Sequence, residues 1–466
     1  MIRSISVFLL IYVLCISVMA QGKNSIINFG HLQHLTERIE FKGDSVDIVH
    51  IYADAPNYAW TDAGDEGIAC VDDAARAAVD YLRYYDLTKD EIYLEKAKPI
   101  LRFVMKMESE DGSFCNFIMH DHSVNTTGQT SYKSFGWWGV RGVWCMSVGY
   151  RLLRDRDPEF ASLLKKGIER TFSHIDSLFL KYGRVQELKG YKTPQWLLYE
   201  SGADVTSELL LGLCDYYRAT NDKDVKKRIE KLAEGLMVMQ DGDIKKSPHG
   251  LHRSWQTMWH MWGNGQTQAL ATAGKILHNE RMIHSAEREA NGFYSRLLIE
   301  GFMKELDVAD SSKTLDYDQI AYGVRPMAAG LIRLYETTKN KNYLTMAGLA
   351  ASWLFGNNPP GQIMYDTLTG RCFDGIRDSA TVNKNSGAES TIEALHTLIE
   401  LERYPTARKY YFYKRIRNES KRRYLYAVFE DRDRNELTLG LDLNKSNLFV
   451  YEGDESRKFN KRMGKE

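Results

Sequence analysis

The feature that most constrains this chain is an alternation of two kinds of predicted helix between residues 70 and 402. One kind is apolar on nearly all faces, as in Trp137–Tyr150 and Ser207–Tyr216, and such helices belong in a protein interior. The other kind carries one apolar stripe among Lys and Glu, as in residues 223–240, and is expected on the outside. The chain is therefore predicted to form an inner and an outer layer of helices.

The alternation repeats six times. Inner helices are expected to begin near residues 70, 136, 201, 258, 317 and 387. Outer helices are expected near residues 90–108, 158–178, 223–240, 281–303 and 341–355. The sixth outer helix is expected at residues 31–40 or 407–423. We predict an all-α fold, an (α/α)6 toroid of six helical hairpins; a helical-repeat solenoid is the alternative, although solenoid periods are usually shorter.

The first 20 residues have the pattern of a secretory signal. Arg3 precedes an apolar run from Ile5 to Val18, and Val18-Met-Ala20 then places small residues at the cleavage positions. A membrane anchor is the alternative, but the run is short for a span. We predict a signal peptide at 1–20 and an exported protein, periplasmic or secreted, with no membrane span after signal cleavage.

The remainder divides by composition into two parts. Residues 28–402 are predicted to be the (α/α)6-barrel catalytic domain, and residues 403–466 a small, basic, β-rich C-terminal appendage. Apolar and polar residues alternate there in Tyr424–Phe429 and Leu437–Leu443, which is typical of strands. The run of Lys and Arg before them is interpreted as a solvated face, with contact to a polyanion as the alternative.

Charge and cysteine content exclude several classes of protein. Lys and Arg together number 62, as do Asp and Glu, so nothing indicates a nucleic-acid partner. No cysteine pair has metal-ligand spacing, and neither a metal site nor a cofactor is predicted. The five cysteines after the signal are interpreted as small core residues, although a disulfide between some pair stays open: Cys70, Cys115, Cys145, Cys214 and Cys372.

Acidic residues mark the starts of three predicted inner helices, in Asp62-Ala-Gly-Asp65, Ser201-Gly-Ala-Asp204 and Ser386-Gly-Ala-Glu389. In a toroid the starts of the inner helices gather at one end, so these carboxylates are expected to face one cleft. The alternative is that they cap turns and helices, since Ser-x-x-Glu is also a capping box.

Paired carboxylates at one cleft indicate glycosidic-bond chemistry. One acid, kept protonated, assists the leaving oxygen, while an ionised one activates water or attacks the sugar. Asp72 and Asp73 add further negative charge, which helps to separate the pKa values of neighbouring acids; they could instead serve as caps or pair with Arg76. The catalytic candidates are Asp62, Asp65, Asp72, Asp73 and Glu389.

Aromatic residues lie close to these acids or in the same set of loops. Rigid aromatic surfaces with a few polar groups suit the apolar faces of sugar rings. Core packing is the alternative, and it is expected for Trp144 and Trp353. The substrate-binding candidates are Trp60, Trp137, Trp138, Trp255, Trp259, Trp262, His260 and Tyr322.

Three segments of the chain resemble motifs of one family. Asp62-Ala-Gly-Asp65 is similar to the Asp-Ala-Gly-Asp motif of family-nine glycoside hydrolases, which are inverting (α/α)6-barrel endoglucanases. Leu354–Gly361 resembles that family's Leu-Gly-x-Asn-Pro-x-Gly segment, and Glu389 stands where the family keeps its acid. The resemblance implies that Asp65 is the catalytic base, that Asp62 helps to hold the water, and that Glu389 is the acid.

The chain departs from this pattern in two places. Residues 362–386 contain no histidine where the family has a histidine motif, and Ala388 replaces the usual Asn. The resemblance therefore extends most firmly to the broad six-hairpin glycosidase superfamily. The segment Val71-Asp-Asp73 resembles the unsaturated-glucuronyl hydrolases of that group.

We therefore expect an exported glycoside hydrolase that cleaves a polysaccharide or oligosaccharide by inversion, with an Asp base and a Glu acid. The enzymatic alternative is an unsaturated-glucuronyl hydrolase, lyase or epimerase on the same fold, using Asp72 or Asp73. A carbohydrate-binding toroid without catalysis is the remaining alternative.

Overall fold

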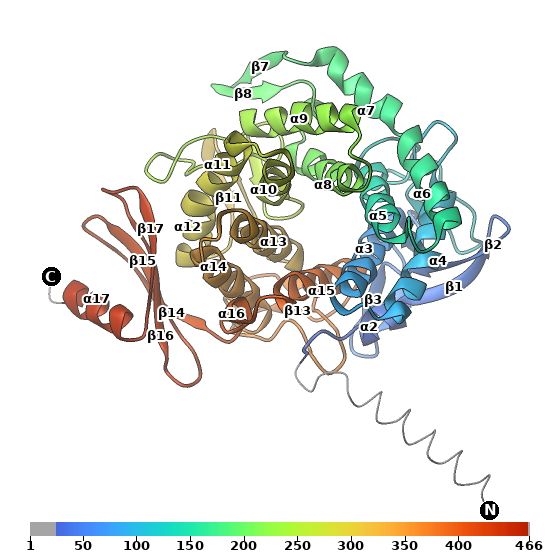
Figure 1. The fold of residues 1–466 in the computed structure, drawn as a ribbon. Coiled ribbons are helices and arrows are strands. Elements are labelled where there is room, and N and C mark those ends of the chain that lie inside the picture. The colour runs from blue at the N-terminus through green and yellow to red at the C-terminus, as the bar shows by residue number, and fades with distance from the viewer. Residues whose placement is uncertain (1–24, 465–466) are drawn as a thin grey trace, which may run out of the picture.

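The computed structural model describes residues 25–464. The predicted signal peptide, residues 1–20, lies outside this range. The described chain is rich in helices, and a β-rich part follows the last long helix of the ring (Figure 1). Within residues 25–464, no helix is long and apolar enough to cross a membrane.

Six helices form the inner layer, and each packs against the next along the chain. They are α3 (Val71–Thr88), α5 (Trp137–Leu153), α8 (Ala203–Thr220), α10 (Gln266–Leu277), α13 (Ala321–Thr338) and α15 (Ala388–Glu402). Helix α15 also packs against α3, which closes the six helices into a ring (Figure 1). The outer helices run back between them, so the inner helices begin at one common end of the ring.

Close packing in the ring depends on small residues where two inner helices meet. A Cβ atom on Gly212 of α8 would lie 2.9 Å from Cα of Trp144 in α5. Only glycine permits this approach of the two backbones. Trp144 itself is buried, as is Trp353, in agreement with the core role predicted for both.

The outer helices are α4 (Glu91–Met107), α6 (Pro158–Arg170), α7 (Phe172–Leu178), α9 (Lys223–Val238), α11 (Glu280–Glu289), α12 (Ser295–Glu300) and α14 (Asn342–Ala351). Of these, α4, α6, α9, α11 and α14 each pack on the inner helix that precedes them. A π-helical segment, Ala290–Tyr294, joins α11 to α12. In α9, Asp222 caps the N-terminus, and the predicted apolar stripe is buried: Val225, Ile229, Leu232 and Leu236.

The helix expected at residues 31–40 is wrong. Helix α2 covers only Gly30–His34, and β1 (Thr36–Phe41) pairs antiparallel with β2 (Asp44–Val49). Burial alternates at the end of β1, where Ile39 and Phe41 are buried and Glu40 is exposed, which is the period of a strand. Lys42 and Gly43 both have positive φ, as a two-residue hairpin turn requires.

Two further expected boundaries differ from the structure. The inner helix expected near 258 begins at Gln266, because Met258–His260 is strand β9 and pairs with β10 (Glu305–Asp307). The outer helix expected at 407–423 is also wrong. Helix α16 covers only Pro405–Arg408, and β14 (Lys414–Lys421) follows as an edge strand whose Lys and Arg side chains discourage further pairing.

The predicted β-rich C-terminal part is a four-stranded antiparallel sheet in the order β14-β15-β16-β17. Its other elements are β15 (Tyr424–Glu430), β16 (Glu436–Asp442), β17 (Asn447–Glu452) and helix α17 (Asp454–Gly464). One face of the sheet, with Leu425 and Leu439, joins the main core. Phe459 and Met463 of α17 cover the other face. Covering both faces explains why β15 and β16 are buried almost throughout.

Short strands connect the helices. They are β3 (Tyr52–Asp54), β4 (Ala59–Thr61), β5 (Ala69–Cys70), β6 (Phe117–Ile118), β7 (Val185–Leu188), β8 (Tyr191–Pro194), β11 (Asp310–Leu315), β12 (Gly375–Ile376) and β13 (Val382–Asn383). Strand β5, paired with β6, leads directly into α3, and the β12–β13 hairpin precedes α15. These two connections position the residues of the candidate site.

Candidate active site

A cavity of about 400 Å³ lies at the end of the ring where α3, α5 and α15 begin. Four carboxylates and two guanidinium groups line it: Asp72, Asp73, Asp374, Glu389, Arg76 and Arg141. Three of the predicted catalytic residues, Asp72, Asp73 and Glu389, therefore meet at one cavity. They come from opposite ends of the helical region, and the closure of the ring brings them together.

Arg76 of α3 organises the acids on one side of the cavity. Its Nη2 donates to Asp73 Oδ1 at 2.7 Å and to Glu389 Oε2 at 3.3 Å. Its Nη1 donates to Glu393 Oε1 at 2.7 Å and to Glu389 Oε2 at 3.4 Å, and Nε donates to the carbonyl oxygen of Asp72. A guanidinium has five N–H donors, so Arg76 uses all of them within the protein.

Glu389 lies in the first turn of α15, and 47% of its side chain is exposed on the cavity. It does not act as the helix cap that was the alternative to a catalytic role, because α15 begins after Gly387 without a side-chain cap. Loss of hydration among the surrounding protein atoms raises the pKa of Glu389 above its ordinary value. Arg76 opposes that rise, while the negative charges of Asp73 and Glu393 add to it.

Asp72 and Asp73 differ in their surroundings although they are adjacent in sequence. The Asp72 side chain is 20% exposed and pairs through Oδ1 with Arg141 Nη1 at 2.9 Å. The Asp73 side chain is 4% exposed and pairs with Arg76, as the sequence analysis allowed. Burial raises the pKa of Asp73, against the effect of Arg76. Asp72 is thus the more accessible of the two carboxylates.

A buried network of charges supports the cavity from below. Glu208 of α8 accepts hydrogen bonds from Arg141 Nε at 2.9 Å, Tyr322 Oη at 2.6 Å and Arg325 Nη2 at 3.1 Å. Burial by itself raises the pKa of Glu208, but Arg141 and Arg325 outweigh burial and lower it to about 2. Arg325 also pairs with Glu393 at 2.7 Å. The network thereby fixes Arg76, through Glu393, and Arg141, through Glu208, and these two arginines pair with the acids of the cavity.

The sequence analysis did not select Arg141, Glu208, Arg325 or Glu393. A signal for them was present, since each is a charged residue within a helix that is predicted to lie in the interior. A buried charge is stable only with a partner of opposite sign, so such residues are expected to pair with one another across the ring.

Asp62 and Asp65 lie in the loop between β4 and β5, and both are exposed. Asp62 forms an ion pair with His120, and the backbone carbonyl of Asp65 accepts a hydrogen bond from Asn125 Nδ2. Neither side chain lines the cavity that Asp72, Asp73 and Glu389 share. Their predicted roles remain predictions.

Part of the aromatic set gathers beside the network. The Trp137 and Trp262 ring centroids are 5.6 Å apart, and the Arg141 guanidinium lies 4.9 Å from the Trp137 ring. His260 stacks on Trp262 at 3.8 Å and pairs with Asp204 at 3.0 Å. Buried Tyr322 connects this group to the charged network through Arg141.

The remaining aromatic candidates lie elsewhere. Trp138 and Trp259 are only 5% and 4% exposed, and Trp138 Nε1 donates to the carbonyl oxygen of Phe114, so their placement favours packing. Trp60 is exposed and stacks on His50 with 3.7 Å between ring centroids. Trp255 is exposed as well.

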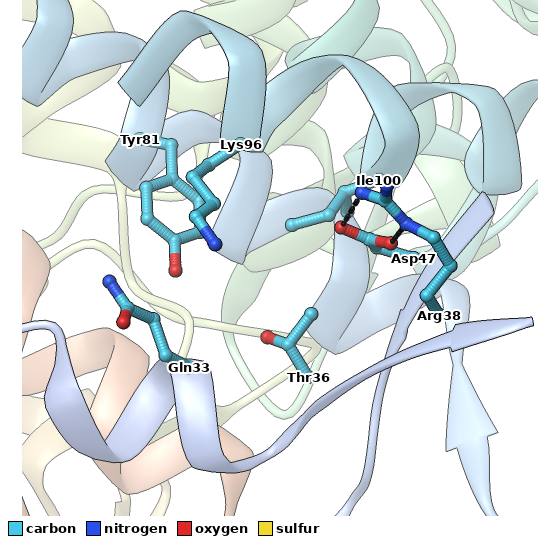
Figure 2. A pocket seen from close by; sticks show the side chains of 7 residues that line it. All are labelled: Gln33, Thr36, Arg38, Asp47, Tyr81, Lys96 and Ile100. Atoms are coloured by element: carbon cyan, nitrogen blue, oxygen red, sulfur yellow. Dashed lines mark hydrogen bonds and ion pairs between the residues drawn. The ribbon is translucent and has the colours of Figure 1, made fainter. Parts of the chain in front are cut away.

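A different cavity, of about 380 Å³, lies on the outer side of the ring between β1, β2, α3 and α4. Its one carboxylate, Asp47, is paired with Arg38 (Figure 2), with 2.6 Å between Arg38 Nε and Asp47 Oδ1. This cavity lacks a second acid, so paired-carboxylate chemistry does not fit it.

The five cysteines of the described range are buried and free, which agrees with the predicted core role. No group of three or more His, Cys, Asp or Glu side chains within residues 25–464 is arranged to hold a metal ion.

Solved structures with the same fold act on sugars in different ways. The cellobiose 2-epimerase from Spirochaeta thermophila aligns with a TM-score of 0.57 and 12% identity, over 83% of this chain and 96% of that chain. The cellobiose 2-epimerase from Bacillus thermoamylovorans aligns with a TM-score of 0.55 and 14% identity, over 80% of this chain and 95% of that chain. A D-mannose isomerase aligns with a TM-score of 0.50 and 12% identity, over 72% of this chain and 87% of that chain. At these identities the likeness shows a shared fold.

No curated protein matches the sequence. The model of glycosyl hydrolase family 9 matches residues 57–370, more than half of the chain. The matched range includes both Asp62–Asp65 and Leu354–Gly361, and it ends before Glu389. The family acts on carbohydrates, and a saccharide substrate follows from membership. The chain belongs to glycosyl hydrolase family 9, within the six-hairpin glycosidase superfamily.

Proposed function

We propose that this protein is a glycoside hydrolase that cleaves a polysaccharide or oligosaccharide on an (α/α)6 toroid. One observation carries the proposal: Glu389 and Asp72 open onto one cavity from opposite sides of the ring closure. Their electrostatic surroundings differ, which is what the division of labour between an acid and a base requires.

Glu389 is the proposed general acid. Its carboxyl group is accessible, and its raised pKa keeps the proton that the leaving oxygen needs. Asp72 is the proposed second carboxylate, because its side chain is accessible at the cavity and is held there by its ion pair with Arg141. Glu389 donates its proton to the glycosidic oxygen as the bond to the anomeric carbon breaks. Asp72 takes a proton from the water that attacks that carbon.

Asp65 is the base that the family resemblance implies, with Asp62 holding the water. The family match over residues 57–370 supports this second assignment of the base. The exposed position of Asp65 outside the cavity lining favours Asp72 instead. Both assignments keep Glu389 as the acid, and they differ in the consequence of a single substitution.

The charges around the cavity favour a neutral sugar over a uronate. Arg76 has no N–H donor left, and Arg141 directs its three nitrogens to Asp72, Glu208 and Tyr322. Four carboxylates face two guanidinium groups in the lining, so a substrate carboxylate would be repelled. This weakens the alternative of an unsaturated-glucuronyl hydrolase.

Epimerisation is the second candidate, because the solved structures with this fold include sugar epimerases and an isomerase. Elimination by a lyase, and binding without catalysis, are also compatible with an aromatic, acid-lined cavity. The three reactions give different products and binding alone gives none, so product analysis decides among the four.

The test is incubation of the purified protein with a panel of glycans in ¹⁸O-labelled water, followed by mass spectrometry. Hydrolysis places one ¹⁸O atom at each new reducing end, while elimination gives an unsaturated product without it. Epimerisation changes neither mass nor chain length. Proton NMR of the first-formed anomer then distinguishes inversion from retention. Products without ¹⁸O would refute the hydrolase proposal.

Export to the periplasm or beyond is a separate proposal, supported by the signal pattern of residues 1–20. Fractionation of cells that express the full chain, with N-terminal sequencing of the product, tests it. A product that stays in the cytoplasm with its first 20 residues attached would refute export.

A further inference from the structure

A cavity of about 570 Å³ lies between the helical ring and the C-terminal sheet. Its walls come from α12, from the loops before α13 and after α14, and from Arg415 of β14. Partly exposed aromatic and apolar side chains line it together with carboxylates: Phe302, Met303, Tyr317, Pro359, Glu300 and Asp316. Neither the catalytic proposal nor the comparisons assign a role to it.

This cavity adjoins the candidate active site. Gln319 lines it, and its backbone exchanges two hydrogen bonds with Ile376, at 3.0 and 2.8 Å. Asp374, two residues before Ile376, lines the active-site cavity. With ordinary strand spacings, the backbones of Gln319 and Asp374 are roughly 8 Å apart. One short strand therefore separates the two cavities, at the same end of the ring.

The Asn-Asn-Pro-Pro segment connects the ring to the C-terminal sheet beside this cavity. Asn357 Oδ1 accepts a hydrogen bond from the backbone N–H of Arg415 at 2.8 Å, and Asn358 Nδ2 donates to the carbonyl oxygens of Trp353 and Gln362. Arg415 Nη1 donates to the carbonyl oxygen of Ile299 in α12. The C-terminal sheet is thereby fastened to the ring at the cavity.

We propose that this cavity binds distal units of the same saccharide chain that is bound in the active site. The faces of Phe302 and Tyr317 suit the apolar faces of sugar rings, and the oxygens of Glu300 and Asp316 accept hydrogen bonds from sugar hydroxyls. The proposal rests on the proposed saccharide substrate, and it gives the C-terminal sheet a role as one wall of a binding subsite.

The test is calorimetric titration with cellohexaose, maltohexaose and the corresponding disaccharides. The Glu389→Gln protein, which is expected to turn over slowly, serves as the background. A hexasaccharide should bind more tightly than its disaccharide, and Tyr317→Ala should weaken hexasaccharide binding roughly tenfold, as loss of a central aromatic contact does. Phe302→Ala should also weaken hexasaccharide binding. Agreement between the two substitutions shows that the loss of affinity does not come from misfolding of one variant.

Tyr182→Ala is the matched control, because Tyr182 is also partly exposed but lies by α7, away from this cavity. Its hexasaccharide affinity should equal that of the background. The proposal is overturned by an absence of hexasaccharide binding, by equal affinity for both lengths, or by hexasaccharide binding that neither Tyr317→Ala nor Phe302→Ala weakens. Full turnover by Glu389→Gln would instead refute the catalytic assignment, whereas the Tyr317→Ala binding difference alone decides the subsite.

Discussion

Arg76 of α3 contacts Glu389 of α15, with 3.3 Å between Nη2 and Oε2, although the two residues are 313 positions apart in the sequence. The contact crosses the point where the ring closes. It couples the proposed acid to Asp73 and Glu393, which share the same guanidinium. The protonation of Glu389 therefore depends on helices from both ends of the ring.

Replacement of Glu389 by Gln is expected to lower kcat/KM roughly 100- to 10,000-fold, because the leaving oxygen loses its proton donor. The melting temperature should change little, since the side chain is partly exposed and the amide keeps its shape. Steady-state kinetics and circular dichroism measure the two effects. Glu280→Gln, at the exposed start of α11, is the control and should retain full activity.

The identity of the base is decided by comparing Asp72→Asn with Asp65→Asn. We expect Asp72→Asn to lower kcat by roughly 100-fold or more, because the attacking water loses its proton acceptor at the cavity. Asp65→Asn should have a small effect on kcat. The reverse pattern would return the base to the exposed loop, as the family resemblance implies.

The pH profile of kcat/KM is expected to fall on the alkaline side as Glu389 loses its proton. Loss of hydration raises the pKa of Glu389, and Asp73 adds to that rise, so this limb should lie above pH 4.5. Asp73→Asn removes one negative charge beside Glu389. The positive charge of Arg76, which Asp73 and Glu389 share, then stabilises the ionised form of Glu389 more strongly. The limb should then move to lower pH.

An unchanged limb in Asp73→Asn, or a shift to higher pH, would show that Glu389 does not control the profile. The profile of Asp86→Asn is the control, because Asp86 lies at the opposite end of α3 and pairs with Lys89.

Glu393 is expected to matter for stability, since its carboxylate is 1% exposed and pairs with both Arg76 and Arg325 at 2.7 Å. Glu393→Gln removes the negative charge that pairs with the buried guanidinium groups of Arg76 and Arg325. The substitution should lower the free energy of unfolding by about 3–5 kcal/mol. Urea titration followed by circular dichroism measures the loss. Glu95→Gln breaks an exposed pair with Lys98 and should cost at most about 1 kcal/mol.

Glu108 gives a stability prediction that is independent of the active site. Burial raises the pKa of Glu108 from 4.5 to about 7, against the effect of Arg170. A carboxyl group with a raised folded pKa contributes stability that is present below pH 4.5 and lost as pH rises towards 7. Between these values the protein should lose on the order of 3 kcal/mol through this group.

Glu108→Gln is expected to flatten this part of the stability profile, so that the variant gains relative to the natural protein at pH 8 and not at pH 4. Thermal unfolding at the two pH values measures the difference. An equal effect of the substitution at both pH values would contradict the prediction.

The sequence alone determined the two layers of helices, because apolar periodicity reports directly which faces are buried. The starts of five inner helices, the long outer helices and the β-rich C-terminal part follow from it. A helix was predicted at residues 31–40 or 407–423 because the six-fold alternation left one outer helix to be assigned. The local alternation in β1, and the pairing of β14 with β15, outweighed that expectation.

The sequence also determined the acidic candidates, but only the tertiary structure decided which of them share a cavity. Asp72, Asp73 and Glu389 meet there because the ring closes α15 on α3, a contact that no local pattern encodes. Arg76 reaches Glu389 and Glu393 through the same closure, whereas Arg141 and Glu208 pair between the consecutive inner helices α5 and α8. Buried charges must pair, yet the choice of partner depends on which helices become neighbours in space.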